Sequence, residues 1–256
     1  MTVNLTVDRT GVAEITLRRA AINPAWVDAL AEAVAGCAND DQIRAVLVRA
    51  DGPTFTVGGD LHHFTAEIDD LPGALEQMIA PYHQTLLALA DLPVPVVCAA
   101  QGAIAGGGLG LLWASDLVLL ADDAKLATGF SRLGLSGDGG STWYLPRMLG
   151  TRRALALMLQ GTVLGATAVL ELGLADQVVP ADQLGAAGTS AALRLAAGPT
   201  VALAEIRRLV RAAFERTLAD GLDAELAANL RCAVTADACE GIASFTERRE
   251  PKFLGR

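Results

Sequence analysis

Apolar and polar residues alternate at the start of the chain, and a helical pattern then replaces the alternation. Alternation over Val3–Asp8 and Val12–Leu17, separated by the turn Arg9-Thr10-Gly11, predicts a β-hairpin. Pro24 suits the first turn of a helix, and we expect that helix to run to about Ala38. The chain therefore begins with two strands followed by a helix.

The order of strand, second segment and helix recurs further along the chain. Ala45–Ala50 is an apolar run that predicts a buried strand, and it leads through a turn to Phe55–Leu61, which contains two adjacent glycines. Leu71–Leu89 has helical period, and we expect Pro81 to kink or split that helix. Another strand, turn and helix occupy Val94–Asp116. Because simple βαβ alternation lacks the second strand, the pattern favours an α/β spiral of ββα turns.

Helical pattern dominates the second half of the chain. The remaining predicted elements are strands at Leu117–Ala121 and Lys125–Thr128, helices from about Ser141 and Thr151, and one strand at Ala175–Val179. The pattern is otherwise helical from Gly161 onward, and from Ala181 it is helical throughout. We therefore expect a ββα core over residues 1–190 and a helical oligomerisation region over residues 191–256.

Composition narrows the class of protein. With 256 residues and 52% hydrophobic content, the chain can bury a large core, and we expect one domain with an appendage. The formal net charge of −9 argues against a nucleic acid as partner, because such partners are held through their phosphates. The amino terminus lacks a basic region followed by an apolar stretch, and the longer apolar runs are interrupted, so we expect neither a signal peptide nor a membrane partner.

The four cysteines, Cys37, Cys98, Cys232 and Cys239, have none of the spacings typical of zinc sites. Two of them lie in apolar runs, so we expect buried thiols rather than disulfides or a bound metal. Reduced thiols suit the cytoplasm, where we expect the protein to act.

The stretch Val96–Trp113 carries the strongest chemical signal. It passes from an apolar strand through Gly106-Gly107-Gly108 into an apolar helix. Glycines at a helix start leave backbone N–H groups uncovered, so a phosphate, a carboxylate or an oxyanion can approach them. Phosphate loops are excluded, because no Gly-Lys-Ser/Thr follows and Leu111 replaces the last glycine of a dinucleotide fingerprint. A hydrolase elbow also fails, because Asp138 replaces its final glycine. We interpret the turn as an oxyanion hole.

Five ordered motifs are spread along the chain. They are Phe55-x-x-Gly58-Gly59-Asp60-Leu61, Gly102-x-x-x-Gly106-Gly107-Gly108, Ala114-Ser115-Asp116, Gly134-x-x-x-Asp138-Gly139-Gly140 and Phe245-Thr246-Glu247-Arg248-Arg249-x-Pro251-x-Phe253. Together they resemble the crotonase family, also called the enoyl-CoA hydratase/isomerase family, from about Leu5 to Phe253. The resemblance implies a crotonase-type ββα spiral core, an α-helical carboxy-terminal oligomerisation region, and assembly into a homotrimer or homohexamer.

The resemblance implies an acyl-CoA thioester as substrate, with coenzyme A as part of the substrate and no separate cofactor. By the resemblance, the amides of Gly59 and Gly107 hold the enolate oxygen, and each such donor is typically worth roughly 3 kcal/mol of barrier. Hydratases of the family place two glutamates around this site, and the matching positions here are Gly110 and Phe130. Neither residue can transfer a proton, so ordinary water addition lacks its acid and base.

Asp138 remains as the acid and base. It resembles the carboxylate of ring-forming and double-bond-shifting isomerases of phenylacetyl-CoA-type pathways. One carboxylate suffices for a 1,3-proton shift, because it can take a proton from one carbon and return it to another. From local sequence alone, Asp138 could equally cap the helix that begins near Ser141. We expect an isomerase; the alternatives are an enoyl-CoA hydratase-type lyase of fatty-acid metabolism, an aryl-CoA dehalogenase-like hydrolase and a non-catalytic acyl-CoA binder.

The histidines give weaker signals. In 4-chlorobenzoyl-CoA dehalogenase, an aspartate matching Asp138 attacks the aromatic ring and a histidine matches His83, but that enzyme's tryptophan corresponds to Phe130, which has no N–H donor. His83 lies on a predicted helix, where a structural or surface histidine is the commoner case. His62 and His63 follow the first glycine turn and are expected near the acyl group, without the carboxylate pattern of a metal site.

For coenzyme A, the resemblance points to a loop at residues 19–24 and to two other segments. The predicted substrate-binding residues are Arg19, Ala21, Asp60, Leu61, His62, His83, Phe130, Lys252 and Phe253. A neighbouring subunit would contribute the last two. Ala20 stands where the family often has a basic residue, and Arg19 is expected to replace it.

Overall fold

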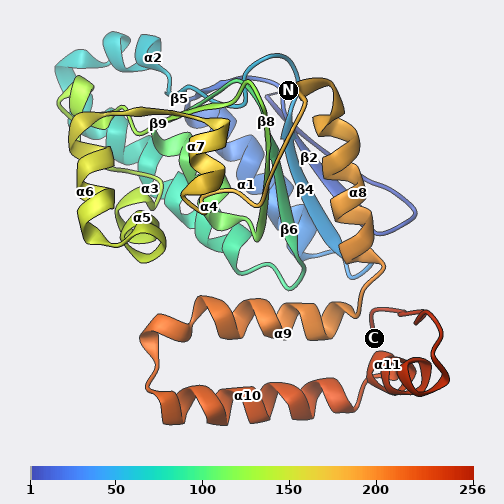
Figure 1. Ribbon diagram of the computed structural model, residues 1–256. Coiled ribbons are helices and arrows are strands. Elements are labelled where there is room, and N and C mark those ends of the chain that lie inside the picture. Colours follow the sequence, from blue (N-terminus) through green and yellow to red (C-terminus); the bar gives the residue numbers. More distant parts are fainter. Residues whose placement is uncertain (1) are drawn as a thin grey trace.

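A six-stranded sheet runs through the computed structural model, which describes residues 2–256 (Figure 1). The strands are β1 (Val3–Val7), β2 (Val12–Leu17), β3 (Ala21–Ile22), β4 (Ala45–Ala50), β5 (Gly58–Gly59), β6 (Val96–Ala100), β7 (Ala103–Ala105), β8 (Leu117–Ala121), β9 (Lys125–Ala127), β10 (Val163–Gly165) and β11 (Gln177–Val179). The α-helices are α1 (Pro24–Ala38), α2 (Leu61–Ala66), α3 (Leu71–Ala90), α4 (Leu109–Ala114), α5 (Ser141–Leu149), α6 (Thr151–Gln160), α7 (Ala166–Glu171), α8 (Leu184–Ala196), α9 (Thr200–Arg211), α10 (Leu218–Ala233) and α11 (Ala236–Glu247). Short 3-10 helices are η1 (Ile68–Asp70), η2 (Gly106–Gly108), η3 (Phe130–Leu133), η4 (Ala181–Gln183) and η5 (Ala213–Glu215).

The strands are shared between one large sheet and two small ones. The large sheet has the order β1-β2-β4-β6-β8-β11, in which β1 is antiparallel to β2 and the other pairs are parallel. The small sheets have the orders β10-β9-β7 and β3-β5. Successive turns of the chain thus give one strand to the large sheet and the next to a small sheet. This arrangement confirms the predicted ββα spiral.

Both faces of the large sheet are covered. Successive side chains along each strand therefore point into two different apolar cores. On β4, Val46 and Val48 face the core that contains α1 and α4, whereas Ala45 and Leu47 face the core that contains α8. Figure 1 shows α8 on one side of the sheet and α1, α3 and α4 on the other. Burial on both faces explains why these strands are continuous apolar runs instead of alternating ones.

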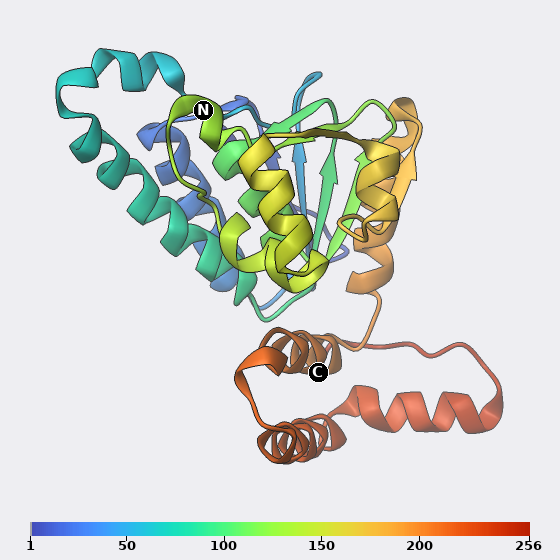
Figure 2. The same ribbon diagram turned by 60° about the vertical axis from the view of Figure 1, so that its left-hand side comes forward.

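The helix α8 belongs to the sheet layer and crosses the division expected after residue 190. Its second half contributes Ala191, Ala192 and Ala196 to the core against the sheet. The helices that stand apart from the sheet are α9, α10 and α11, as Figures 1 and 2 both show. We call these three helices the carboxy-terminal helices.

One expectation about local structure is wrong, and of the two outcomes expected at Pro81, a kink or a split, the split does not occur. The segment after Gly161 contains a second strand, β10, which pairs antiparallel with β9. A three-residue strand has too few positions to show a pattern, and it forms here because β9 offers a free edge. Pro81 does not split its helix, since α3 runs unbroken from Leu71 to Ala90.

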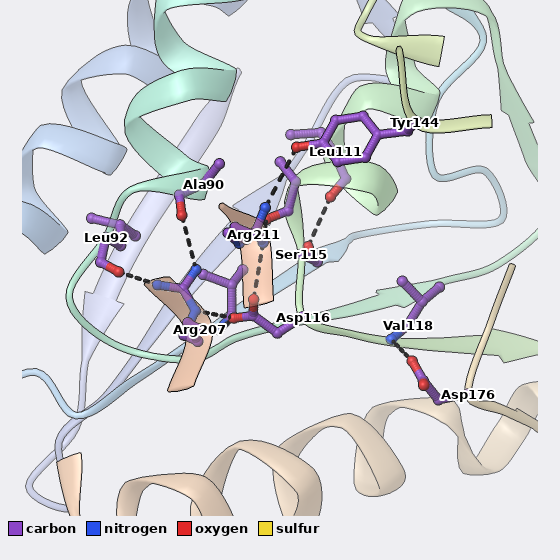
Figure 3. Close-up of polar contacts among 12 residues, drawn as sticks. Ala90, Leu92, Leu111, Ser115, Asp116, Val118, Tyr144, Asp176, Arg207 and Arg211 are labelled. Carbon is purple, nitrogen blue, oxygen red and sulfur yellow. Dashed lines mark hydrogen bonds and ion pairs between the residues drawn. The ribbon is translucent and has the colours of Figure 1, made fainter. Parts of the chain in front are cut away.

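Ion pairs fasten α9 to the core at the end of α4 (Figure 3). Arg207 donates from Nε to Oδ2 of Asp116 at 2.5 Å, and Arg211 donates from Nη2 to Oδ1 at 2.9 Å. Arg207 also donates to the carbonyl oxygens of Ala90 and Leu92. Because only 9% of the Arg207 side chain is exposed, this ion pair is largely shielded from water.

Cys37 and Cys98 are buried free thiols, and burial raises the pKa of Cys37 to about 12. Cys232 is partly buried and Cys239 is exposed. Between residues 2 and 256, no helix is long and apolar enough to cross a membrane. The same residues contain no group of three or more His, Cys, Asp or Glu side chains arranged to hold a metal ion.

Candidate active site

The two glycine turns singled out in the sequence lie against each other. Gly58 has a φ of +80°, and a Cβ built on it would lie only 3.0 Å from the carbonyl oxygen of Ala105 and 3.4 Å from Cα of Gly106. A side chain there would be both strained and crowded, so glycine is what allows the two backbones to approach. The turn that carries Gly59 is thereby placed beside the turn that carries Gly107.

The turn at Gly107 opens a helical segment, because η2 leads directly into α4. The first N–H groups of such a segment have no acceptor within the helix, so they are available to an anionic oxygen. The carbonyl oxygen of Gly107 is held by the hydroxyl of Tyr82 at 2.9 Å. Tyr82 is buried, packs edge-on against Trp26, and has its pKa raised chiefly by burial, so it stays a neutral donor. The residue that carries the proposed oxyanion donor is therefore held through its own carbonyl group.

Asp138 lies directly beside this turn. Its Oδ1 is 2.6 Å from Nε2 of His83 and accepts the N–H of Gly139 at 2.5 Å. Its Oδ2 is 2.8 Å from the place that a Cβ on Gly107 would occupy. The carboxylate is 18% exposed, whereas the side chain of His83 is 45% exposed. The structure thus brings Asp138, Gly107 and His83 together.

The alternative role of Asp138 as a helix cap finds no support in the geometry. The N-cap of α5 is Gly140, and no side chain donates or accepts a capping hydrogen bond there. The carboxylate of Asp138 instead accepts from Gly139, which precedes the helix, and from His83 on another helix. The side chain is therefore directed toward the glycine turn.

Gly110 and Phe130, the positions that match the hydratase glutamates, have different surroundings. A Cβ on Gly110 would lie 2.6 Å from Cδ1 of Leu86 and 2.7 Å from the carbonyl oxygen of Gly139, so α4 has no room for a carboxylate there. Phe130 begins η3, and its ring comes within 4.0 Å of the Cβ position of Gly106. Phe130 therefore places an apolar ring beside the glycine turn.

The predicted residues of the first loop gather at the Gly58-Gly59 turn. Arg19 donates from Nη2 to Oδ2 of Asp60 at 2.7 Å, and the second oxygen of Asp60 caps α2 by accepting from the N–H of His62 at 3.1 Å. Ala21 pairs with Gly58 in the parallel ladder of β3 and β5. Leu61 and His62 follow on the exposed first turn of α2, whereas Nε2 of His63 is buried and has no partner among residues 2–256.

Lys252 and Phe253 lie elsewhere in the single chain. They follow α11, whereas α2 stands at the other end of the molecule (Figures 1 and 2). The backbone N–H of Lys252 donates to Glu240 at 2.8 Å, and the Phe253 ring packs near Gly241 of the same helix. Within one chain these two residues do not join the others.

A cavity of about 1060 Å³ lies between α3, α5 and α9, and His83 and Asp138 form part of its wall. Apolar side chains such as Leu87, Trp143 and Phe214 line much of the rest. An apolar space beside a carboxylate is typical of a site for an organic acyl group.

Tyr82 is a functional residue that the sequence did not single out. It lies on α3 immediately before His83, in the stretch expected to be helical. A tyrosine within an apolar helix is expected to be buried, and a buried tyrosine hydroxyl usually finds a hydrogen-bond partner. This was the signal that could have identified the residue. Its acceptor, the carbonyl of Gly107, lies 25 positions away in the chain and has no signature of its own.

Known proteins resemble this chain along nearly its whole length. The profile of the enoyl-CoA hydratase/isomerase family matches residues 8–256. The 1,2-epoxyphenylacetyl-CoA isomerase of Escherichia coli K12 is 35% identical over 254 residues, covering 96% of each chain. The trans-2-decenoyl-[acyl-carrier-protein] isomerase of Streptococcus mutans is 30% identical, covering 96% of this chain and 95% of its own. The crystal structure of an enoyl-CoA hydratase from Polaromonas sp. JS666 superposes with a TM-score of 0.92 at 30% identity, covering 98% of this chain and 99% of that one.

Proposed function

Because the chain belongs to the enoyl-CoA hydratase/isomerase family, we propose that it shifts a double bond in an acyl-CoA thioester, with Asp138 as acid and base. The observation that carries this proposal is the position of Oδ2 of Asp138, which faces Gly107 at the glycine turn. Similar proteins are named both as isomerases, of 1,2-epoxyphenylacetyl-CoA and of a decenoyl thioester, and as hydratases. The preference for an isomerase therefore rests on the single carboxylate at this turn.

The reaction needs an oxyanion site and one mobile proton. The thioester oxygen accepts the N–H groups of Gly59 and Gly107, whose turns abut. Oδ2 of Asp138 removes a proton from a carbon next to the double bond or the carbonyl, and the C–H electron pair passes into an enolate held by the two amides. The protonated carboxyl then returns the proton to the carbon at the other end of the delocalised system. The double bond has moved, and the enzyme ends as it began.

Hydration would need a further acid or base to activate water. The α4 position that matches a hydratase glutamate is Gly110, where Leu86 and the Gly139 carbonyl fill the space of a side chain. The second matching position holds the apolar ring of Phe130. A single carboxylate beside the glycine turn therefore favours proton transfer within the substrate over water addition.

Coenzyme A binds, in this proposal, across the Arg19 loop and the start of α2. The guanidinium of Arg19 is about half exposed and uses one nitrogen on Asp60, which leaves further N–H donors for a phosphate. Leu61 and His62 lie on the same exposed edge. The acyl group extends past Phe130 toward Asp138.

The carboxy-terminal helices form the interface of a homotrimer or homohexamer in this proposal. Leu218, Leu222, Leu226 and Leu230 recur every fourth position of α10 and are 55–80% exposed. Such a stripe on a helix is typical of a surface that packs against another helix. A second copy of the chain is the natural occupant, because it could also bring Lys252 and Phe253 to its neighbour's coenzyme A site.

The proposed function is tested with a panel of 2-enoyl-, 3-enoyl- and aryl-CoA thioesters, followed by mass and ultraviolet absorbance. Isomerisation changes absorbance without changing mass, hydration adds one water, and dehalogenation replaces a halogen with a hydroxyl group. We expect the first outcome, and we expect Asp138→Asn to abolish it. A water adduct would favour the hydratase alternative. Binding of these thioesters with no turnover would favour the non-catalytic alternative.

A further inference from the structure

The two oxygens of Asp138 have different surroundings. Oδ1 meets Nε2 of His83 at 2.6 Å and the N–H of Gly139 at 2.5 Å. Oδ2 faces the bare Cα of Gly107 and takes no hydrogen bond from any residue between 2 and 256. An ionised carboxylate can only accept, so His83 must donate from Nε2 in this contact. The protein therefore holds Oδ1 by two hydrogen bonds and leaves Oδ2 facing the glycine turn.

Helix α3 supports the carboxylate and the turn together. Tyr82 and His83 are consecutive on this helix: the first holds the carbonyl oxygen of Gly107 at 2.9 Å, and the second holds Asp138. Tyr82 is only 2% exposed, which anchors this part of α3 in the core. The distance between the oxyanion turn and the carboxylate is thus set by one rigid element, as a preorganised site requires.

We propose that His83 is a positioning residue, which holds Oδ1 of Asp138 so that Oδ2 alone exchanges a proton with the substrate. The inference rests on the proposed function. Oδ2 receives the proton as the C–H electrons enter the enolate, and the same O–H bond breaks when the enolate carbon takes the proton back. His83 keeps its Nε2–H throughout, so no other proton donor or acceptor is needed.

Loss of this hydrogen bond has a consequence that a purely structural role would not have. With only the N–H of Gly139 left on Oδ1, the carboxyl can rotate more freely about its Cβ–Cγ bond and bring its newly acquired proton to water. His83 is 45% exposed, so solvent lies close to this pair. Removing the imidazole should therefore slow the reaction and raise the amount of solvent deuterium incorporated per turnover.

The test compares His83→Leu, His83→Gln and the control Gln84→Leu in heavy water, on the thioester that the wild type isomerises fastest. Gln84 is the next exposed residue of α3, so the control places the same leucine on the same helix. We expect kcat of His83→Leu to fall roughly 10- to 100-fold, as for a misplaced catalytic group, with KM near the wild-type value. His83→Gln should recover most of kcat, because its amide N–H reaches about as far as Nε2.

Two results would overturn the inference. A His83→Leu variant with full kcat and unchanged deuterium incorporation would show that Asp138 needs no support. A His83→Gln variant as slow as His83→Leu would make the imidazole itself the proton carrier. Asp138→Asn, measured in parallel, separates the two proposals: full activity in that variant defeats the proposed function, whereas its inactivity beside an unaffected His83→Leu defeats only the role of His83.

Discussion

In the sheet core, Ile15, Leu17 and Trp26 are at most 1% exposed, whereas in the carboxy-terminal helices Ile242 and Phe245 are 73% and 87% exposed. The core closes its apolar surface within one chain, because helices cover both faces of its sheet. The carboxy-terminal region is tied to the core by the two arginines of α9 at Asp116 and by Arg44, which donates to Thr200 of α9 and to the carbonyl oxygen of Phe253. The leucines of the apolar stripe on α10 stay 55–80% exposed within the chain.

This difference in exposure suggests that the core carries the reaction and the carboxy-terminal helices carry the assembly. The proposed chemistry lies in the region that closes its own core, at two glycine turns that accept or donate hydrogen bonds with Tyr82 and Thr56. The helices contribute a surface and, in the proposed assembly, Lys252 and Phe253. Changes in the core should therefore alter the reaction and leave assembly intact, and changes in the helices should do the reverse.

The largest effect is expected from Gly107→Val. A Cβ at this position would lie 2.8 Å from Oδ2 of Asp138, so valine would displace the carboxylate and crowd the thioester. We expect no measurable isomerisation and an unchanged particle mass by light scattering. Gly165→Val is the matched control, since open space surrounds that glycine and its φ of −77° suits valine. Normal turnover by Gly107→Val would remove this turn from the site.

Asp138→Asn should come next, with a loss of about 10²- to 10⁴-fold in kcat. The amide oxygen can still accept from His83 and Gly139, so the melting temperature and the affinity for the CoA ester should stay near wild type. Exchange of the substrate's α- or γ-protons with heavy water should disappear as well. An asparagine variant that turns over at full rate would rule out proton transfer by this residue.

Assembly should respond to the stripe on α10. Leu222→Asp with Leu226→Asp places two charges on this surface. Because 55–60% of each leucine is left for an interface to cover, losing that burial costs about 2 kcal/mol per subunit. We expect the trimer or hexamer to dissociate in analytical ultracentrifugation at micromolar concentration. Ala227→Asp, exposed but off the stripe, is the control. A wild type that is already monomeric under these conditions would contradict the proposed interface.

Asp116→Ala should weaken the attachment of the carboxy-terminal helices to the sheet core. Removing this carboxylate leaves Arg207 and Arg211 without their partner, at a cost of about 3 kcal/mol for a largely buried pair. Asp176→Ala is a close control: each aspartate accepts a backbone N–H at 2.7 Å from the first part of a neighbouring strand, but only Asp116 also binds arginines (Figure 3). Urea denaturation should show the smaller loss for Asp176→Ala, and equal losses would mean that the arginines contribute little.

The smallest effect concerns the pairing of α9 with α10. Glu205 accepts from Arg231 at 2.7 and 2.9 Å, and this hydrogen bonding, together with Arg208, lowers the pKa of Glu205 to about 2. A pKa lowered by folding gives stability that is present above the unfolded value of 4.5 and is lost as the pH falls toward about 2. The melting temperature of wild type should exceed that of Glu205→Gln at pH 6, and the difference should shrink between pH 4.5 and pH 2.5. If the difference in melting temperature stayed constant over this pH range, the ionised carboxylate of Glu205 would not be its cause.

The sequence alone predicted the spiral and its two glycine turns, because these depend on local properties. Apolar runs with period two or 3.6 specify strands and helices, and a turn such as Gly58, with its φ of +80°, requires glycine whatever surrounds it. The resemblance of five such local motifs to one family was confirmed by the match over residues 8–256. Asp138 was selected on the same grounds, as the carboxylate left when Gly110 and Phe130 could not act.

Only the tertiary structure decided how these pieces meet. His83 and Asp138 are 55 positions apart, and Asp116 and Arg207 are 91 apart, so no local pattern pairs them. The strand β10 exists because β9 offers an edge, and α8 belongs to the core because its small residues fit the sheet. Such contacts depend on the relative placement of whole elements, which the packing of the two cores sets and which periodicity along the chain does not encode.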